Sequence, residues 1–289
     1  MRVTGALTSL LPFGRRLFPA GPAGFPPTSL KATALEIAIL AGHLLRYPSG
    51  IAPERRPSPA APGLGTHGTA RLPRTTGAPV VLVHGFLDNR SVFVPLRRSL
   101  ARHGRRQIES LNHSPLTCDI RAAAGLLGRH VEEICERTGR REVDIVGHSL
   151  GGLIARYYVQ RLGGDVRVRT LVTLGTPHAG TRAVPLMNAH PVVRQMRPGS
   201  DVLGELCEPA PNCRTRFVSF WSDLDQLMVP PETACIEHPD LLVRNVRVSG
   251  IGHLALPVHP AVAAGVRQAL DTEDGAGHAA DNSGGLTAV

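Results

Sequence analysis

A serine stands between two glycines at the end of an apolar run, where Gly147, Ser149 and Gly151 form the pattern G-x-S-x-G. The residues before it, 143–146, are rich in Val and Ile and predict a strand, and the apolar residues after it recur with a helical period. In a sharp turn between strand and helix, a serine hydroxyl is exposed as a nucleophile, and small neighbours let the main chain cross closely. The motif therefore predicts a serine that attacks a carbonyl carbon.

Such a serine needs a base that removes its proton. His253 is the candidate base, because it follows Gly252 in a loop between a predicted strand at 242–248 and the last predicted helix at 261–270. Its place also fits the chain order serine, acid, histidine that accompanies this kind of turn. We therefore expect His253 to accept the proton of Ser149.

Two aspartates follow the predicted strand at 216–221 and are candidates for the acid that orients the base. Asp225 is preferred, because it lies deeper in the turn that leads to Val229 and Pro230. Asp223 stands just after the strand, where an aspartate more commonly bonds turn amides or caps the segment. The sequence favours Asp225 and leaves Asp223 as the alternative.

Backbone amides are the expected donors to the oxyanion. One is the amide of Leu150, which follows the nucleophile at the start of its helix. The other is the amide of Phe86 in the loop after the first strong strand, where Gly85 lets the backbone turn in closely. His84 in the same loop is expected to pin it by hydrogen bonds, and His148 and His178 have no spacing that demands a chemical role.

The elements that must position these residues alternate between strand and helix from residue 78 onward, which is typical of a parallel sheet covered on both faces. The predicted strands lie at 79–84, 107–112, 143–146, 168–174, 216–221 and 242–248. The predicted helices lie at 92–103, 120–137, directly after Ser149, and at 261–270. The sequence therefore predicts an α/β fold with a mostly parallel sheet of about six strands.

A family resemblance rests on four segments: V-H-G-F at 83–86, G-H-S-L-G-G at 147–152, T-L-G-T-P-H-A-G at 173–180 and G-H at 252–253. Together they resemble the α/β-hydrolase lipases over about residues 78–271. Within that superfamily the chain is similar to small bacterial triacylglycerol lipases and to the GPI inositol-deacylase-like group. The resemblance implies the α/β-hydrolase fold and ester hydrolysis without a cofactor. It maps the catalytic triad onto Ser149, Asp225 and His253, and the oxyanion donors onto Phe86 and Leu150.

The segment between the strands at 168–174 and 216–221 predicts a small lid or none. Its apolar residues suit either a fatty acyl chain over the serine or ordinary helix packing, since methionine fills cores as readily as binding surfaces. These residues are Val184, Pro185, Leu186, Met187, Val192, Val193 and Met196.

The predicted function is a serine hydrolase that cleaves carboxylic esters, of lipid or acyl-glycerol type, through an acyl-enzyme. The alternatives are an acyltransferase, in which an alcohol replaces water, and a catalytically silent lipid-binding or scaffold protein on the same fold. We expect no structural metal, because the five cysteines show no zinc-ligand spacing. The family resemblance implies that no cofactor is needed. Cys207 and Cys213 flank a short loop and are expected either to form a disulfide or to remain free thiols.

Charge and composition limit the classes of binding partner that we expect. The chain has 289 residues and a formal net charge of +9 that comes almost wholly from arginine. No basic stripe interleaved with aromatic residues is visible, so nucleic acid is not an expected partner. The expected partner is a small-molecule or lipid ester, while peripheral contact with an anionic membrane and the oligomeric state stay open.

The chain divides into an N-terminal extension at 1–77, a catalytic domain at 78–272 and a tail at 273–289 that is expected to be disordered. The extension is rich in Pro, Gly and Ala and has one apolar stretch at 32–45. That stretch is shorter than the roughly 17 to 25 residues of a membrane helix, so we expect a helix that packs on the main domain, with an interfacial anchor or degenerate signal as alternatives. A secreted or membrane-associated location is favoured over a cytoplasmic one.

Overall fold

The computed structural model describes residues 36–42, 45, 77–86, 88–105, 107–111, 119–183, 190–271 and 286–287. The strands are β1 (Val80–Val83), β2 (Ile108–Leu111), β3 (Val143–His148), β4 (Val168–Leu174), β5 (Arg216–Ser222), β6 (Leu242–Ser249) and β7 (Leu286–Thr287). The α-helices are α3 (Val94–Arg102), α4 (Ile120–Thr138), α5 (Leu150–Arg161), α6 (Pro191–Gln195), α7 (Asp201–Glu205) and α8 (Pro260–Asp271). Short 3-10 helices are η1 (Arg90–Phe93), η2 (Gly164–Val166) and η4 (Pro231–Ala234).

The strands form one sheet in the order β2-β1-β3-β4-β5-β6-β7, and every pairing in the described part of the chain is parallel. The predicted mostly parallel sheet is therefore confirmed in the described part of the chain. The seventh strand differs from the prediction, because its two residues lie in the tail that was expected to be disordered. The free edge of β6 offers unpaired backbone groups, and Leu286 pairs there with Val248.

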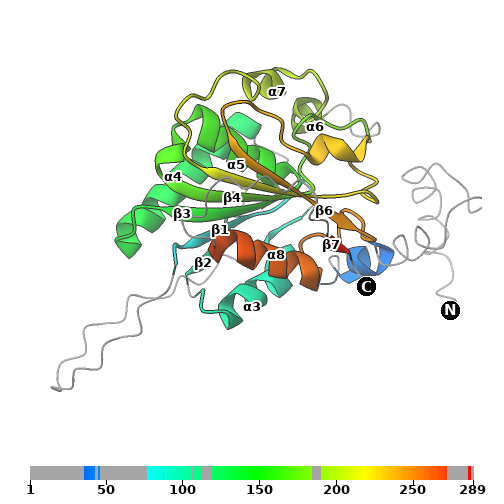
Figure 1. The fold of residues 1–289 in the computed structure, drawn as a ribbon, viewed down its shortest axis with the longest axis horizontal. Coiled ribbons are helices and arrows are strands. Elements are labelled where there is room, and N and C mark those ends of the chain that lie inside the picture. Colours follow the sequence, from blue (N-terminus) through cyan, green and yellow to red (C-terminus); the bar gives the residue numbers. More distant parts are fainter. Residues whose placement is uncertain are drawn as a thin grey trace, which may run out of the picture.

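Helices cover both faces of the sheet, with α4 and α5 on one face and α3 and α8 on the other (Figure 1). Strand β1 shows why a continuous apolar run suits this place. Val81 and Val83 pack in the core cluster that contains residues of α4 and α5, while Val80 and Leu82 pack in the cluster that contains residues of α3 and α8. All four side chains are fully buried, as expected for a strand between two helical layers.

Local signals fix the ends of α4. The Asp119 side chain accepts a hydrogen bond of 2.7 Å from the amide of Ala122 at the start of the helix. The helix ends at Gly139, which adopts the left-handed conformation with φ of 66° that favours glycine. The helix predicted at 92–103 is present as α3, and its first two residues belong to the preceding 3-10 turn η1, which Asn89 caps by accepting from the amide of Ser91.

The strand order places two loops side by side at the carboxyl ends of β1 and β3. The chain leaves β1 through α3 to reach β2 on one side, whereas β3 pairs with β1 on the other side. Such a switch in strand order opens a crevice at the carboxyl ends of the strands. Val83 pairs with Gly147 in this register, so the loop after β1 meets the turn that carries Ser149.

A buried ion cluster joins the opposite end of the sheet to α8. The carboxylate of Asp144 on β3 has no exposed surface and lies 2.7 Å from Arg169 Nη2 and 3.2 Å from Arg105 Nη1. Arg105 also donates to the carbonyl of Leu270 at 2.7 Å. Because burying one unpaired charge is costly, these groups are expected to depend on one another for stability.

The segment between β4 and β5 packs on the core. Val192, Val193 and Met196 are buried in the cluster that contains α4 and α5, so the structure favours the helix-packing interpretation for these three residues. The residues 184–187 of the same prediction lie outside the described residues. Cys207 and Cys213 are free thiols in this structure.

The described part of the N-terminal extension is helical at residues 36–42. Among the described residues, no helix combines the length and apolarity that crossing a membrane requires. The prediction that this stretch packs on the main domain agrees with the contacts of Glu36 and with Ile39, which lies against the core cluster on the α3 and α8 side.

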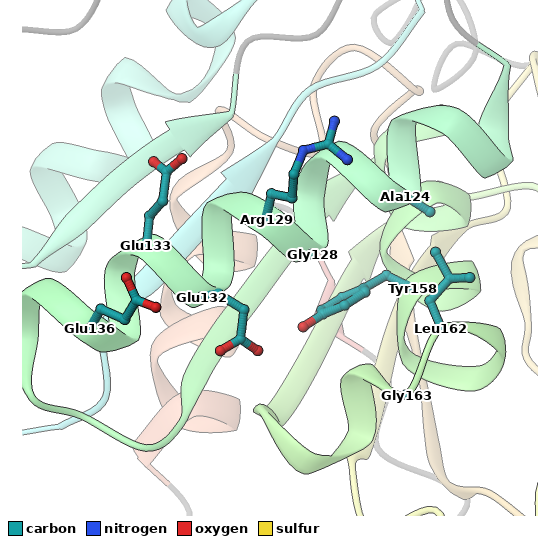
Figure 2. Close-up of a pocket in the computed structure, with 10 residues that line it drawn as sticks. Ala124, Gly128, Arg129, Glu132, Glu133, Glu136, Tyr158, Leu162 and Gly163 are labelled. Atoms are coloured by element: carbon teal, nitrogen blue, oxygen red, sulfur yellow. The ribbon is translucent and has the colours of Figure 1, made fainter.

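A groove of about 540 Å³ lies between α4 and the end of α5 (Figure 2). Glu132, Glu136 and Arg129 line it together with Tyr158 and Gly163. Tyr158 lies nine residues after Ser149, which is roughly 14 Å along α5. The groove is therefore distinct from the candidate active site.

Candidate active site

Ser149 occupies the turn between β3 and α5 with a φ of 53° and a ψ of −123°. A positive φ is uncommon for a residue other than glycine and is found where surrounding structure enforces it. Neighbouring glycines allow the close approach: a Cβ on Gly151 would lie 2.1 Å from the carbonyl oxygen of Val83, and one on Gly147 would lie 2.6 Å from the Cα of Gly152. The predicted turn geometry is thus present, and its glycines are required by the crossing backbone.

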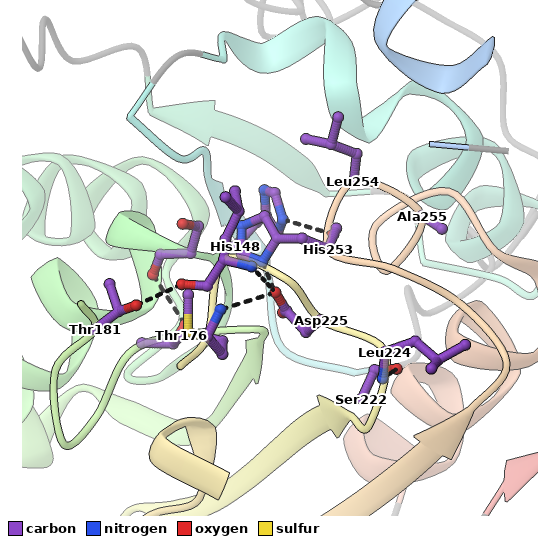
Figure 3. A network of polar contacts seen from close by, with 12 residues as sticks. His148, Thr176, Thr181, Ser222, Leu224, Asp225, His253, Leu254 and Ala255 are labelled. Atoms are coloured by element: carbon purple, nitrogen blue, oxygen red, sulfur yellow. Dashed lines mark hydrogen bonds and ion pairs between the residues drawn. The ribbon is translucent and has the colours of Figure 1, made fainter. Parts of the chain in front are cut away.

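Asp225 and His253 meet in a buried hydrogen bond (Figure 3). His253 Nδ1 lies 2.7 Å from Asp225 Oδ2, and each residue is only 3% exposed. The other carboxylate oxygen of Asp225 accepts the amides of Leu227 at 2.9 Å and Met228 at 3.1 Å. The carboxylate is therefore fixed in orientation. Because it accepts from Nδ1, it selects the tautomer in which His253 Nε2 carries a free lone pair.

Asp223 takes a different place. Its Oδ2 atom pairs with Arg247 Nη2 at 2.7 Å, in a pair whose side chains are partly exposed to solvent. Arg247 in turn lies over the ring of Trp221, 5.7 Å from the ring centroid. The structure thus brings Asp225 to His253 and brings Asp223 to a surface arginine.

The glycine of the G-T-P segment makes room for Asp225 and His253. Gly175 has a φ of +53°, and a Cβ there would lie 3.0 Å from both Asp225 Oδ2 and His253 Nδ1. The next residue, Thr176, donates its hydroxyl hydrogen to the carbonyl oxygen of Ser149 at 2.9 Å. This segment therefore shapes the surroundings of the serine, the acid and the base.

His178 in the same segment lies inside the protein. Its Nε2 is 3.0 Å from Thr173 Oγ1 and its Nδ1 is 3.4 Å from Arg156 Nη1. Burial and the nearby guanidinium lower the pKa of His178 well below its ordinary value, which keeps the ring neutral. These contacts fit a packing role for His178.

The two candidate oxyanion donors lie next to Ser149. Leu150 is the first residue of α5, so its amide belongs to the positive end of a helix. On the other side, a Cβ built on Gly85 would lie 3.2 Å from the Cβ of Ser149, which places the loop that contains Phe86 against the serine. The ring of Phe86 packs edge-on against His190 at a centroid distance of 5.1 Å.

His84 holds the first loop, as its predicted role requires. Its Nδ1 donates to the carbonyl oxygen of Gly85 at 2.9 Å, and the ring is buried. Burial lowers the pKa of His84, so the neutral ring is favoured at this position.

His148 and Asp88, for which no role was predicted, also lie at the site. The ring of His148 packs on that of His253 with centroids 4.8 Å apart, and its Nε2 lies 3.3 Å from the carbonyl oxygen of His253. Its Nδ1 lies 3.3 Å from Asp88 Oδ2, an ion-pair distance without hydrogen-bond geometry. The position of His148 directly before Ser149 was the available signal, whereas nothing in the sequence pointed to Asp88.

Glu36 reaches the same site from the N-terminal helix. Its Oε2 accepts the amide of Leu254 and its Oε1 accepts the amide of Ala255, both at 2.9 Å. These two amides follow His253 directly. The contact joins residues 218 positions apart in the sequence, and its only sequence signal was an acidic residue within an otherwise apolar stretch.

Electrostatics at the site favour the charged form of His253. Burial lowers the pKa of His253, but the negative charges of Asp225, Glu36 and Asp88 raise it, and the net position is above its ordinary value of 6.5. Three carboxylates therefore stabilise an imidazolium at this place. Within the described residues, no group of three or more histidine, cysteine or acidic side chains could hold a metal ion.

Two curated relatives are triacylglycerol lipases. The one from Burkholderia plantarii is 29% identical over 131 residues, which is 43% of this chain and 34% of the relative. The one from Pseudarthrobacter phenanthrenivorans is 29% identical over 113 residues, which is 37% of this chain and 35% of the relative. The match thus spans about a third of the length of each relative.

Solved structures share the fold at low sequence identity. Aspergillus fumigatus lipase B superposes with a TM-score of 0.60 and 16% identity, over 69% of this chain and 54% of that one. The mature form of Bacillus licheniformis lipase BlEst2 gives a TM-score of 0.56 and 14% identity, over 69% of this chain and 95% of that one. These likenesses confirm the predicted fold.

One protein family matches just over half of the chain. Its description is palmitoyl protein thioesterase, and the match covers residues 79–226. The matched segment runs from the first strand of the sheet to the turn after β5 and contains Phe86, Ser149, Leu150 and Asp225. With the α/β-hydrolase architecture, this match shows that the chain belongs to the palmitoyl protein thioesterase family.

Proposed function

We propose that the protein is a serine hydrolase that cleaves carboxylic esters of fatty acids through an acyl-enzyme on Ser149. One observation carries the proposal: the buried hydrogen bond between His253 Nδ1 and Asp225 Oδ2, at the same end of the sheet as the strained turn of Ser149. The arrangement supplies a nucleophile, a base and an acid in the roles that acyl transfer needs.

In the first step, Ser149 Oγ attacks the ester carbonyl carbon while His253 Nε2 accepts the hydroxyl proton. Asp225 holds the ring through Nδ1 and stabilises the imidazolium that forms. The amides of Leu227 and Met228 keep the Asp225 carboxylate in place, so little reorganisation is needed as charge develops.

The tetrahedral intermediate places a negative charge on the former carbonyl oxygen. The amides of Leu150 and Phe86 are the proposed donors to this oxygen, and the start of α5 adds its favourable dipole. When the intermediate collapses, the carbon–oxygen bond to the alcohol breaks, and the imidazolium of His253 returns its proton to the alcohol. His253 then removes a proton from a water molecule, whose oxygen attacks the acyl carbon. As the bond from this carbon to Ser149 Oγ breaks, the imidazolium of His253 returns the proton to Ser149 and the acid leaves.

The comparisons favour a fatty acyl group in the substrate. The curated relatives are triacylglycerol lipases, and the family is described by palmitoyl protein thioesterase. The family match supports thioester hydrolysis as a second candidate function, with a thiol in place of the alcohol. The same serine, acid and base serve both reactions, so the leaving group distinguishes them.

Two measurements test this proposal. A fluorophosphonate probe is expected to label native protein at the peptide that contains Ser149, and to leave Ser149→Ala and heat-denatured protein unlabelled. Turnover of palmitoyl esters and palmitoyl thioesters of matched solubility then assigns the leaving group. Acyl transfer would appear as a new ester when an alcohol acceptor is added. A folded chain that resists the probe and hydrolyses neither substrate would overturn the proposal in favour of a silent binding protein.

A further inference from the structure

The loop that carries His253 is held by a carboxylate from outside the catalytic domain predicted at 78–272. Glu36 belongs to the helical segment 36–42, which Figure 1 shows in blue beside the loop after β6. We propose that Glu36 is a positioning residue for His253, which makes the N-terminal helix a working part of the active site. This inference rests on the proposed function, because it assigns Glu36 a role in the action of the proposed base.

Both carboxylate oxygens of Glu36 take part in the contact, which we call the clamp. The two oxygens of Glu36 accept the amides of Leu254 and Ala255, which are consecutive and directly follow His253 (Figure 3 labels both). Each hydrogen bond is 2.9 Å long. Since both carboxylate oxygens accept, the contact fixes the direction of the backbone as well as its position.

The clamp complements the contact made by Asp225. Asp225 holds the ring of His253 through Nδ1, whereas Glu36 holds the main chain just after it. A histidine whose ring and backbone are both fixed keeps Nε2 in one place relative to the serine. Misplacement of a catalytic group by about 1 Å can cost two orders of magnitude in rate.

The glycine before His253 is explained by the same contact. A Cβ on Gly252 would lie 2.6 Å from Glu36 Cδ and 2.7 Å from Glu36 Oε1. The Gly252 φ lies outside the left-handed region, so its backbone conformation does not by itself demand glycine. The space beside Gly252 is thus occupied by Glu36, and the G-H pair in the sequence reflects this packing.

The helix presents one side to the domain. Ile39, three residues after Glu36, packs on the core cluster of α3 and α8, and residues three apart share a helix face. Ile37, two residues before Ile39, lies on nearly the opposite side of the helix and is 57% exposed. Glu36 is therefore held against the loop by the packing of its own helix, and Ile37 offers a control position on the same segment.

The charges around His253 come from four elements. Asp225 follows β5, Asp88 follows β1, Glu36 lies on the N-terminal helix, and the ring of His148 at the end of β3 packs on His253. Glu36 contributes to the negative surroundings that raise the pKa of His253. The pKa of Glu36 itself lies above its ordinary value. Burial raises this pKa, and the two amides and the charge of His253 lower it by less.

A purely structural contact would hold the helix on the domain and would leave kcat and the pKa of His253 unchanged. The experiment separates the two roles in the full chain with Glu36→Gln, which keeps the shape of the side chain but removes its charge and one acceptor. Ile37→Gln is the matched control on the exposed side of the helix. A soluble short-chain ester gives kcat and KM across the acidic and neutral range, and NMR follows the titration of the His253 ring, assigned with His253→Gln.

For Glu36→Gln we expect kcat to fall about tenfold with little change in KM, as for the loss of one charged hydrogen bond. The acidic limb of the rate profile and the His253 titration should both move to lower pH, while Ile37→Gln behaves as wild type. Unchanged kcat and an unchanged titration in folded Glu36→Gln would overturn the inference.

Two further measurements cover the cases in which Glu36→Gln does not fold or the wild type hydrolyses no ester. If Glu36→Gln does not fold, Gly252→Ala displaces the carboxylate while keeping its charge, and it should lower kcat; wild-type kcat in that variant would count against the clamp. If the wild type hydrolyses no ester, the proposed function fails on its own. The NMR titration still decides whether Glu36 acts on His253.

Discussion

Asp225 and His253 lie 28 residues apart on the loops after β5 and β6, and they meet because those two strands are parallel neighbours. Ser222 pairs with Val248 near the ends of the strands, so both chains leave the sheet at the same edge. The hydroxyl of Ser222 donates to the carbonyl oxygen of Ile251 at 2.6 Å and joins the two loops below the pair. The register of β5 and β6 therefore brings Asp225 and His253 together.

The rate of ester hydrolysis is expected to fall as the pH falls through the pKa of His253. His253 acts as a base only when Nε2 is unprotonated, and three nearby carboxylates hold its pKa above 6.5 in spite of burial. The acidic limb of kcat/KM, measured with a soluble ester, should therefore lie above pH 6.5. A limb clearly below that pH would mean that the carboxylates do not govern the base.

Adding a methyl group at Gly175 is expected to damage activity more than stability. The new Cβ would press on both Asp225 Oδ2 and His253 Nδ1, so Gly175→Ala should lower kcat by about 10²-fold. The strained φ should also lower the free energy of unfolding by about 1 to 3 kcal/mol. Rates and denaturant unfolding measure the two effects.

Gly199→Ala is the matched control for that variant. Gly199 has a φ of +76°, but its added Cβ would meet nothing within 4 Å. It should therefore show the strain without the loss of rate. Equal kcat losses in both variants would contradict a specific role of Gly175 at the acid–base pair.

Asp144→Asn tests the ion cluster at the other end of the sheet. The substitution leaves Arg105 and Arg169 without the buried charge that they share, so the free energy of unfolding should fall by about 3 to 5 kcal/mol. Below the unfolding transition, kcat should stay near that of wild type, because Asp144 lies far from Ser149 along β3. A stability change within 0.5 kcal/mol would show that the cluster contributes little.

Local sequence signals sufficed for the elements and for the serine turn. Alternation of apolar strands and amphipathic helices predicted the sheet, and the glycines around Ser149 predicted a turn whose geometry they alone allow. The preference for Asp225 over Asp223 also followed from local turn chemistry, and the structure joins Asp225 to His253.

Contacts between residues far apart in the chain could not be predicted from the sequence. Glu36 meets Leu254 across 218 residues, and Asp88 meets His148 only because β1 and β3 are neighbours. Neither pair shares a spacing that a periodic pattern could reveal. The steric need for glycine at Gly175 could not be predicted for the same reason. The atoms that a side chain there would meet belong to the loops after β5 and β6.

The most direct test of the central claim is the hydrolysis of p-nitrophenyl esters from acetyl to palmitoyl by the full chain. Ser149→Ala and Asp225→Asn are expected to lose activity by about 10³-fold or more, while Asp223→Asn keeps it. Activity that survives in Ser149→Ala, or that depends on Asp223 rather than Asp225, would contradict the proposed triad.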